Sequence, residues 1–116
     1  MTQEPVDKYF GIPMSEWIER IPNELELDAV GLWQIIPVGA DGFGLSGERL
    51  DDFGYRCILA LLRRGAAPVK SKPNAVGWAP ATEYTGTHEE VARQIIDDWR
   101  AGRLVPDHDG LSFSIF

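Results

Sequence analysis

The residues with the clearest chemical potential are the glycines of one short stretch. Gly42-Phe43-Gly44-Leu45-Ser46-Gly47 matches the pattern G-x-G-x-x-G. In dinucleotide-binding proteins this pattern lets a strand turn tightly into a helix whose N-terminus faces a pyrophosphate. Even if residues 32 to 38 form a strand, Gly39, Ala40 and Asp41 separate it from Gly42, and the next helix opens with carboxylates that repel phosphate. We therefore interpret the glycines as a turn that precedes a helix.

A ligand role for the same loop is the alternative interpretation. The loop from Gly39 to Gly47, GADGFGLSG, has four glycines, which permit positive φ values. The chain lacks an acid about twenty residues later, where a dinucleotide site needs one, but Lys70 and Lys72 are near enough to meet an anion. A small-molecule-binding or nucleotide-binding domain that uses this loop is our second functional hypothesis.

Cys57 is the single cysteine of the chain. It would be a nucleophile only if His88 or His108 lay beside it and lowered its pKa. Because it falls on the inward stripe of an expected helix, we predict a buried structural thiol. One cysteine allows no intramolecular disulfide, which favours a reducing, cytoplasmic setting.

Pro106-Asp107-His108-Asp109-Gly110 resembles part of a calcium loop, because closely spaced carboxylates can share a hard cation. The other acids of such a loop are missing from the sequence, so we predict a turn. A metal held by both histidines would need distant segments to converge, and we expect no metal and no cofactor.

The first helical segments raise one open question. A short helix is expected from Ser15, as N-cap, to Ile21, with Pro22 ending it. In residues 24 to 36 the apolar residues follow a helical stripe, Asn23 and Glu26 suggest a capping box, and Pro37 would terminate the helix. Leu32 to Val38 alone could instead be a buried strand, so helix and strand both remain open, with helix favoured.

The remaining elements follow clearer patterns. A central helix is predicted from Glu48 to Arg64, with Ser46 as its cap and Gly65 after its end. Thr87 and Glu90 form a capping box before a helix from His88 to Ala101 that Gly102 stops. Short strands are possible around Val69 and from Trp78 to Tyr84, and Leu111 to Phe116 alternates like a half-buried strand. We predict an α+β fold, residues 1–116 forming a single compact domain of three to four helices packed with a small sheet.

Charge gives the leading functional hypothesis. The net charge is −7, which disfavours direct nucleic-acid binding and anionic membranes and favours a basic protein as partner. The N-terminus shows no export signal, and no apolar run has transmembrane length. The expected partner-binding surface combines helix acids with loop aromatics: Phe43, Glu48, Asp51, Asp52, Trp78, Glu89, Asp97 and Asp98. We predict a non-catalytic, acidic protein-binding domain of bacterial type, such as an immunity protein or antitoxin-like inhibitor.

Overall fold

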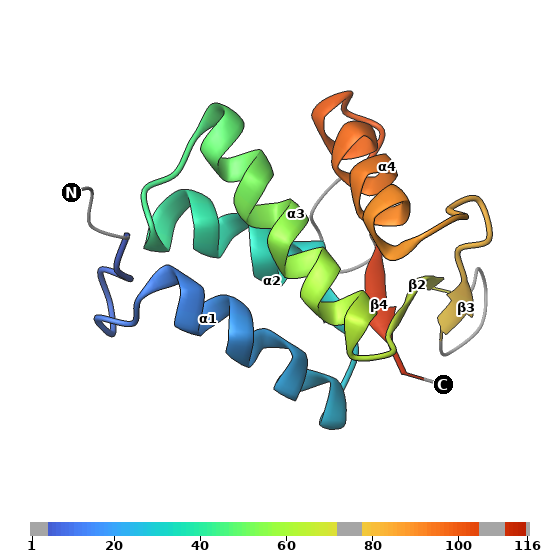
Figure 1. The fold of residues 1–116 in the computed structure, drawn as a ribbon, viewed down its shortest axis with the longest axis horizontal. Coiled ribbons are helices and arrows are strands. Elements are labelled where there is room, and N and C mark those ends of the chain that lie inside the picture. Colours follow the sequence, from blue (N-terminus) through green and yellow to red (C-terminus); the bar gives the residue numbers. More distant parts are fainter. Residues whose placement is uncertain (1–4, 72–77, 105–110, 116) are drawn as a thin grey trace.

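Figure 1 shows the computed structural model, in which residues 5–71, 78–104 and 111–115 are described. They contain four α-helices and a four-stranded antiparallel sheet, which confirms the predicted α+β fold. The elements in chain order are α1 (Met14–Arg20), the 3-10 helix η1 (Ile21–Glu26), β1 (Val30–Gly31), α2 (Leu32–Pro37), the π-helical turn η2 (Val38–Gly42), α3 (Gly47–Arg63), β2 (Ala67–Ser71), β3 (Trp78–Pro80), α4 (His88–Arg100) and β4 (Ser112–Ser114).

Helix α3 lies at the centre, between α1 on one side and α4 on the other (Figure 1). Its apolar residues recur at helical spacing and face the core, where Phe53, Cys57 and Ile58 are fully buried. The helix ends as the sequence predicts, because Gly65 has a φ of 106° and its N–H bonds to the carbonyl of Leu62. The N–H of Ala66 bonds to the carbonyl of Leu61, which completes a Schellman motif.

Helix α4 begins with the predicted capping box. The Thr87 hydroxyl accepts from the Glu90 N–H at 3.1 Å, and the Glu90 carboxylate accepts from the Thr87 N–H at 3.3 Å. Gly102, with a φ of 77°, follows the end of the helix. Both boundaries are local features, which is why the sequence predicts them well.

The structure of residues 21 to 42 matches neither the single helix over residues 24 to 36 nor the strand from Leu32 to Val38. Pro22 does not end the helical path, because proline is tolerated in a first turn, and α1 continues into η1. The Asp28 carboxylate then accepts the N–H of Ala29, and the chain is extended at Val30–Gly31. Leu32 to Val38 is helical and not a strand. It starts where the Gln34 side chain accepts the N–H of Gly31 at 2.9 Å.

Proline also shapes the end of α2. Pro37 is the last residue of α2 and has no N–H to continue the ladder, and the chain widens into η2 instead of stopping. The N–H of Phe43 bonds back to the carbonyl of Val38, five residues earlier, at 3.1 Å. The helical path therefore carries on into the glycine-rich loop.

The sheet has the order β1-β4-β2-β3, so β4 lies between two earlier strands. Phe113 faces Val30 of β1 and Pro68 of β2 in the antiparallel registers. Leu111 and Phe113 are buried as the alternating pattern predicts. Ser112 is also buried, so at this position β4 is covered on both faces and departs from the half-buried pattern that the sequence predicts.

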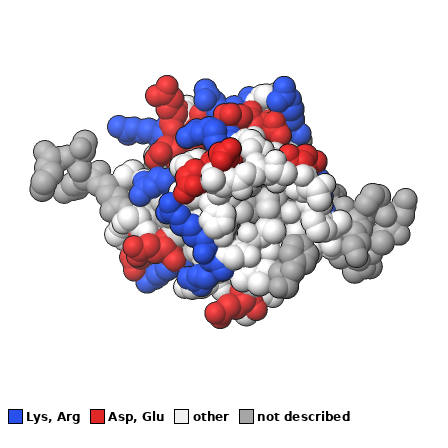
Figure 2. Space-filling view, turned by 45° about the vertical axis from the view of Figure 1, so that its right-hand side comes forward, with Lys and Arg blue, Asp and Glu red and all other residues white. Residues whose placement is uncertain are grey.

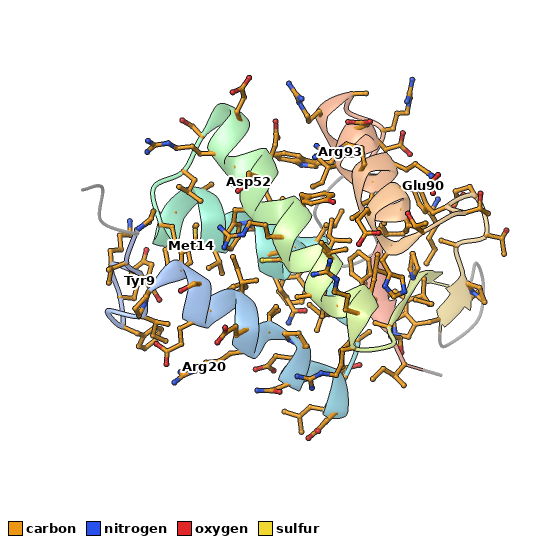
Figure 3. All side chains as sticks on the ribbon, viewed as in Figure 1. Tyr9, Met14, Arg20, Asp52, Glu90 and Arg93 are labelled. Carbon is orange, nitrogen blue, oxygen red and sulfur yellow. The ribbon has the colours of Figure 1, made fainter. Side chains whose placement is uncertain are left out.

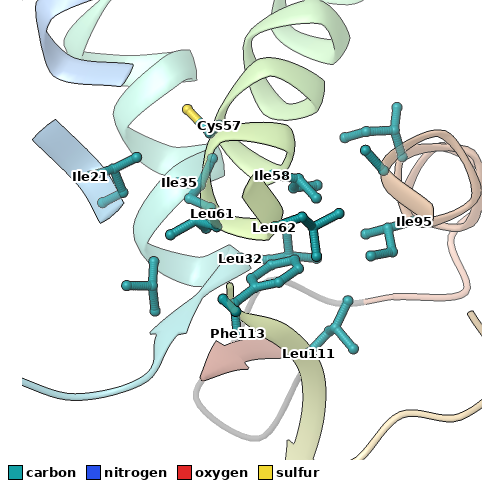
Figure 4. Packing of buried hydrophobic residues seen from close by; sticks show 14 of the residues in the cluster. Ile21, Leu32, Ile35, Cys57, Ile58, Leu61, Leu62, Ile95, Leu111 and Phe113 are labelled. Atoms are coloured by element: carbon teal, nitrogen blue, oxygen red, sulfur yellow. The ribbon is translucent and has the colours of Figure 1, made fainter. Parts of the chain in front are cut away.

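The core lies where α3, α4 and the sheet meet. Figure 4 shows Phe113 and Leu111 beneath Leu62 of α3, with Ile95 of α4 on one side and Ile21 of η1 on the other. The Cα radius of gyration is 13.8 Å, close to the value of about 13 Å expected for a compact domain of this size.

Candidate functional site

The carboxylates of the expected partner-binding surface are mostly engaged with arginines of the same chain. Asp51 at the start of α3 is buried, and its Oδ2 lies 3.0 Å from Arg100 Nε of α4. The other pairs are Asp52 with Arg56 at 3.9 Å, Glu89 with Arg63 at 3.2 Å and Asp98 with Arg103 at 3.1 Å. Glu48 and Asp97 are exposed, and within the described ranges neither makes an ion pair.

The resulting surface is mixed in charge. Figure 2 shows Lys and Arg side chains interleaved with Asp and Glu on its upper part, the level at which Figure 1 places α4 and the start of α3. A hollow of about 270 Å³ between these helices is lined by Glu48, Asp51 and Asp52 together with Arg93 and Arg100. Most of the acids expected to face a partner thus balance cations of the same chain, and the Asp51–Arg100 and Glu89–Arg63 pairs join the two helices.

Asp98 is additionally held by Tyr84. The Tyr84 hydroxyl donates to Asp98 Oδ2 at 2.8 Å. This hydrogen bond, together with one from Arg103, holds the pKa of Asp98 below its usual value. Burial raises the pKa of Tyr84, and the hydrogen bond to Asp98 raises it further. The pair fixes the loop before α4 against that helix.

The two aromatic residues expected on the surface lie in different settings. Phe43 is only 8% exposed, and its ring centroid lies 5.5 Å from that of Phe53 and 6.4 Å from that of Trp17. The expectation that Phe43 is exposed is therefore wrong: η2 turns the start of the loop inward, against α1 and α3. Trp78 lies on β3 and is partly buried.

The glycine-rich loop serves packing. Gly39 is buried, and a Cβ there would lie 2.5 Å from Phe53 Cδ1 and 2.8 Å from Leu50 Cδ1. The N–H groups of Phe43 and Leu45 bond to carbonyls of Val38 and Gly39, so they are not directed at an anion. Lys70 pairs with Glu83 at 3.3 Å, and Lys72 lies outside the described residues. These features disfavour a phosphate cradle.

The other residues that the sequence suggests for chemistry are Cys57, the two histidines and the acids near the C-terminus. Cys57 is fully buried, as predicted, and burial raises the pKa of its thiol. His88 is exposed at the start of α4. The predicted turn at Asp107-His108-Asp109-Gly110 lies outside the described residues. Within the described ranges, no group of three or more His, Cys, Asp or Glu side chains is placed to hold a metal ion.

A surface that the sequence reasoning missed lies at the opposite end, where Figure 3 places Tyr9 and Met14 far from Glu90 and Arg93 of α4. Residues 5–13 fold back on themselves and are named here the N-terminal loop. Val6 pairs with Pro13, and the N–H of Asp7 bonds to the carbonyl of Ile12 at 2.8 Å. The Asp7 carboxylate accepts the N–H of Tyr9 at 2.9 Å, and Gly11 closes the turn with a φ of 70°.

The tip of this loop is apolar and exposed. Phe10 is 80% exposed and Tyr9 is 63% exposed. The loop is also fastened to η2, because the N–H of Lys8 bonds to the carbonyl of Gly42 at 3.0 Å and the Tyr9 hydroxyl donates to Asp41. Two large aromatic side chains are therefore presented to solvent by a segment that has its own hydrogen bonds.

A cleft of about 440 Å³ lies behind the loop tip. Tyr9 and Phe10 line one part of it, Trp17 of α1 another, and Val38 and Asp41 of η2 a third. A second hollow of about 380 Å³ shares Ile12 and Trp17 and continues along α1 to Arg20 and on to Glu24 of η1. Aromatic and aliphatic walls with a carboxylate at the rim suit an amphipathic cationic side chain.

The electrostatics at the rim are set by one short network. Lys8 Nζ lies 2.8 Å from Asp41 Oδ1 and 5.1 Å from the centroid of the Tyr9 ring. Hydrogen bonds from Lys8 and then from Tyr9 hold the pKa of Asp41 below its usual value, and the hydrogen bond to Asp41 raises the pKa of Lys8. Asp41 therefore stays ionised at neutral pH, and the Lys8 ammonium balances its charge at the mouth of the cleft.

A sequence signal for this loop exists. Asp7 stands two residues before Tyr9 and four before Gly11, a spacing typical of a turn that displays the residues between them. The pairing of the loop with η2 had no such signal, because Lys8 and Asp41 are far apart in the chain.

No protein-family model, curated protein or solved structure matches this chain. In the described part of the chain, no helix has both the length and the apolar character needed to cross a bilayer.

Proposed function

We propose that this chain is a non-catalytic binding domain for a basic protein, and that the N-terminal loop and its cleft form the interface. The observation that carries the proposal is the exposure of Tyr9 and Phe10 beside an apolar cleft with Asp41 at its rim. Aromatic residues next to a pocket are typical centres of protein interfaces, and exposed acids around them guide a basic partner.

The charge of the whole chain supports the same partner. A net charge of −7 accelerates encounter with a basic surface, and exposed acids such as Glu48 and Asp97 contribute to this long-range attraction without contacting the partner. An inhibitor that covers the active surface of a basic enzyme, as immunity proteins and antitoxins do, has this physical character. Of the acids expected on the partner-binding surface, only Glu48 and Asp97, which make no ion pair among the described residues, act as steering charges in this proposal, because arginines balance Asp51, Asp52, Glu89 and Asp98.

The test compares Phe10 with Leu27, the two large apolar residues that are most exposed among the described ones. Leu27 follows η1 and is 84% exposed. Tagged wild type, Phe10→Ser and Leu27→Ser are used to capture proteins from source lysate, and salt-released basic proteins are identified and purified. Calorimetry then measures each affinity at low and high salt. We expect Phe10→Ser to weaken binding about 30-fold, the effect of losing about 2 kcal/mol at an interface centre.

Leu27→Ser, the matched control, should bind like the wild type. Equal affinity of wild type and Phe10→Ser would contradict the proposed interface. Failure to recover any basic protein that salt releases would contradict the proposed function itself.

A further inference from the structure

The rim of the cleft already holds one ammonium group, that of Lys8. Its Nζ contacts Asp41 at 2.8 Å and lies over the face of the Tyr9 ring, with 5.1 Å to the centroid. This combination of a carboxylate with an aromatic face is a recognised arrangement for binding alkylammonium groups. The chain thus shows, with its own side chain, how this rim binds a lysine.

The internal contact is exchangeable. The Lys8 and Asp41 side chains are 54% and 63% exposed, and exposed ion pairs are weak and readily replaced. Lys8 is not among the residues that line the cleft, so its aliphatic stem leaves the apolar walls free. A lysine that enters from a partner can place its stem along Ile12, Trp17 and Val38 and still reach the carboxylate.

We infer that the cleft binds a lysine side chain of the basic partner, whose ammonium takes the place of Lys8 on Asp41 and Tyr9. Lys8 then acts as a built-in competitor that must leave when the partner binds. This inference rests on the proposed function for its biological meaning, but the lysine site can be tested without the partner.

The probe is Nα-acetyl-L-lysine N-methylamide, titrated into ¹⁵N-labelled protein at constant ionic strength. We expect saturable amide shifts at Tyr9, Asp41 and Gly42. The norleucine analogue, which lacks the ammonium group, should leave these amides unchanged. Asp41→Asn should remove the response, whereas Asp97→Asn, which neutralises an exposed acid on α4, should retain it.

The competitor role has its own pair of variants. Lys8→Gln should bind the probe about threefold more tightly, because a binding site freed from an internal occupant has its full affinity. Lys70→Gln is the matched control, since it also removes a lysine from an exposed ion pair, with Glu83, but lies on β2. It should bind the probe like the wild type.

Two results would overturn the inference: no saturable shift at Tyr9, Asp41 and Gly42, or equal tightening by Lys8→Gln and Lys70→Gln. Both are independent of the proposed function. If a partner binds in a Phe10-dependent way but the lysine probe gives no amide shifts, only the lysine site is contradicted. If the probe binds but no basic protein is captured, the lysine site is supported and the proposed function is contradicted.

Discussion

Gly39 is the glycine of the loop whose lack of a side chain matters most for packing. A Cβ there would fall 2.5 and 2.9 Å from two atoms of the Phe53 ring, which is fully buried and has no room to move. We expect Gly39→Ala to lower the free energy of unfolding by about 1–3 kcal/mol, the usual cost of overpacking. Urea denaturation followed by circular dichroism measures the change.

Gly54→Ala is the control for this substitution. Its Cβ would meet the terminal methyl of Ile96 at 2.9 Å, at the flexible end of a side chain, and alanine improves helix propensity by about 1 kcal/mol. We expect stability within about 1 kcal/mol of the wild type. Equal losses from both variants would show that the Phe53 contact is not the cause.

Cys57 should be chemically silent in the folded protein. Its thiol is fully buried and its pKa is raised by that burial, so little thiolate is available at neutral pH. We expect iodoacetamide to modify Cys57 only at the rate at which the protein opens, with modification rising in parallel with unfolding in urea. Mass spectrometry of quenched samples gives the rate. Rapid modification without urea would contradict the buried position.

The Tyr84–Asp98 contact predicts a pH effect at low pH. Because the folded-state pKa of Asp98 is below its unfolded value, Asp98 contributes stability above the unfolded value, and this is lost as pH falls through the folded pKa. In Tyr84→Phe the hydroxyl donor is gone, so the Asp98 pKa should rise toward its usual value. Carboxyl ¹³C titration measures this, and an unchanged Asp98 midpoint would refute it. The Glu89 carboxyl, held by Arg63, should titrate alike in both proteins.

At the level of single residues, the sequence predicts exposure poorly when a distant segment covers the side chain. Phe43 lies in a run of glycines and reads as a loop residue, but Trp17 and Phe53 enclose it. Asp51 reads as a free helix-start acid, but Arg100 of another helix pairs with it. Cys57 was predicted correctly because the stripe of α3 alone determines its burial.

At the level of elements, α3 and α4 are joined by ion pairs at both ends of their contact. Asp51 near the start of α3 meets Arg100 at the end of α4, and Arg63 at the end of α3 meets Glu89 at the start of α4. The two helices therefore run antiparallel, with Arg93 of α4 over the Tyr55 ring between the two pairs. The positive N-terminal end of each helix dipole therefore lies beside the negative C-terminal end of the other.

The two ion pairs should differ in strength. Asp51 is buried while both Arg63 and Glu89 are exposed, so solvent screens the second pair more. Double-mutant cycles with alanine should give a coupling of about 1 kcal/mol for Asp51–Arg100 and a smaller coupling for Arg63–Glu89. Thermal and urea unfolding measure both cycles. A larger coupling for the exposed pair would reverse this ranking.

The sequence predicted the elements with local boundary signals and placed strands near β2, β3 and β4, but it did not predict the elements of residues 21 to 42. The α4 capping box and the glycines after α3 and α4 depend on a few neighbouring residues. Residues 21 to 42 combine a 3-10 turn, a two-residue strand, a helix and a π-turn, each too short for a periodic pattern. The cleft depends on this segment and on the N-terminal loop, so the candidate site could not be located from the sequence.

At the level of the whole molecule, the chain has a net charge of −7, and the face seen in Figure 2 carries Lys and Arg side chains among its Asp and Glu side chains. The acids of α3 and α4 are balanced by arginines (Figure 2), and the candidate interface lies at the other end, around an apolar cleft with few charges. The composition of the chain is therefore the basis for proposing a basic partner, while the proposed interface rests on the tertiary structure.

The position of β4 affects the order in which this protein can fold during synthesis. β1 and β2 leave the ribosome before the strand that lies between them, so both expose unpaired backbone until β4 emerges. A stalled nascent chain that ends before Leu111 should remain sensitive to protease around Val30 and Val69, whereas the released chain should resist cleavage there. If the stalled chain were equally resistant, β4 would not be the closing strand. The window for aggregation or for chaperone binding would then end earlier than the topology implies.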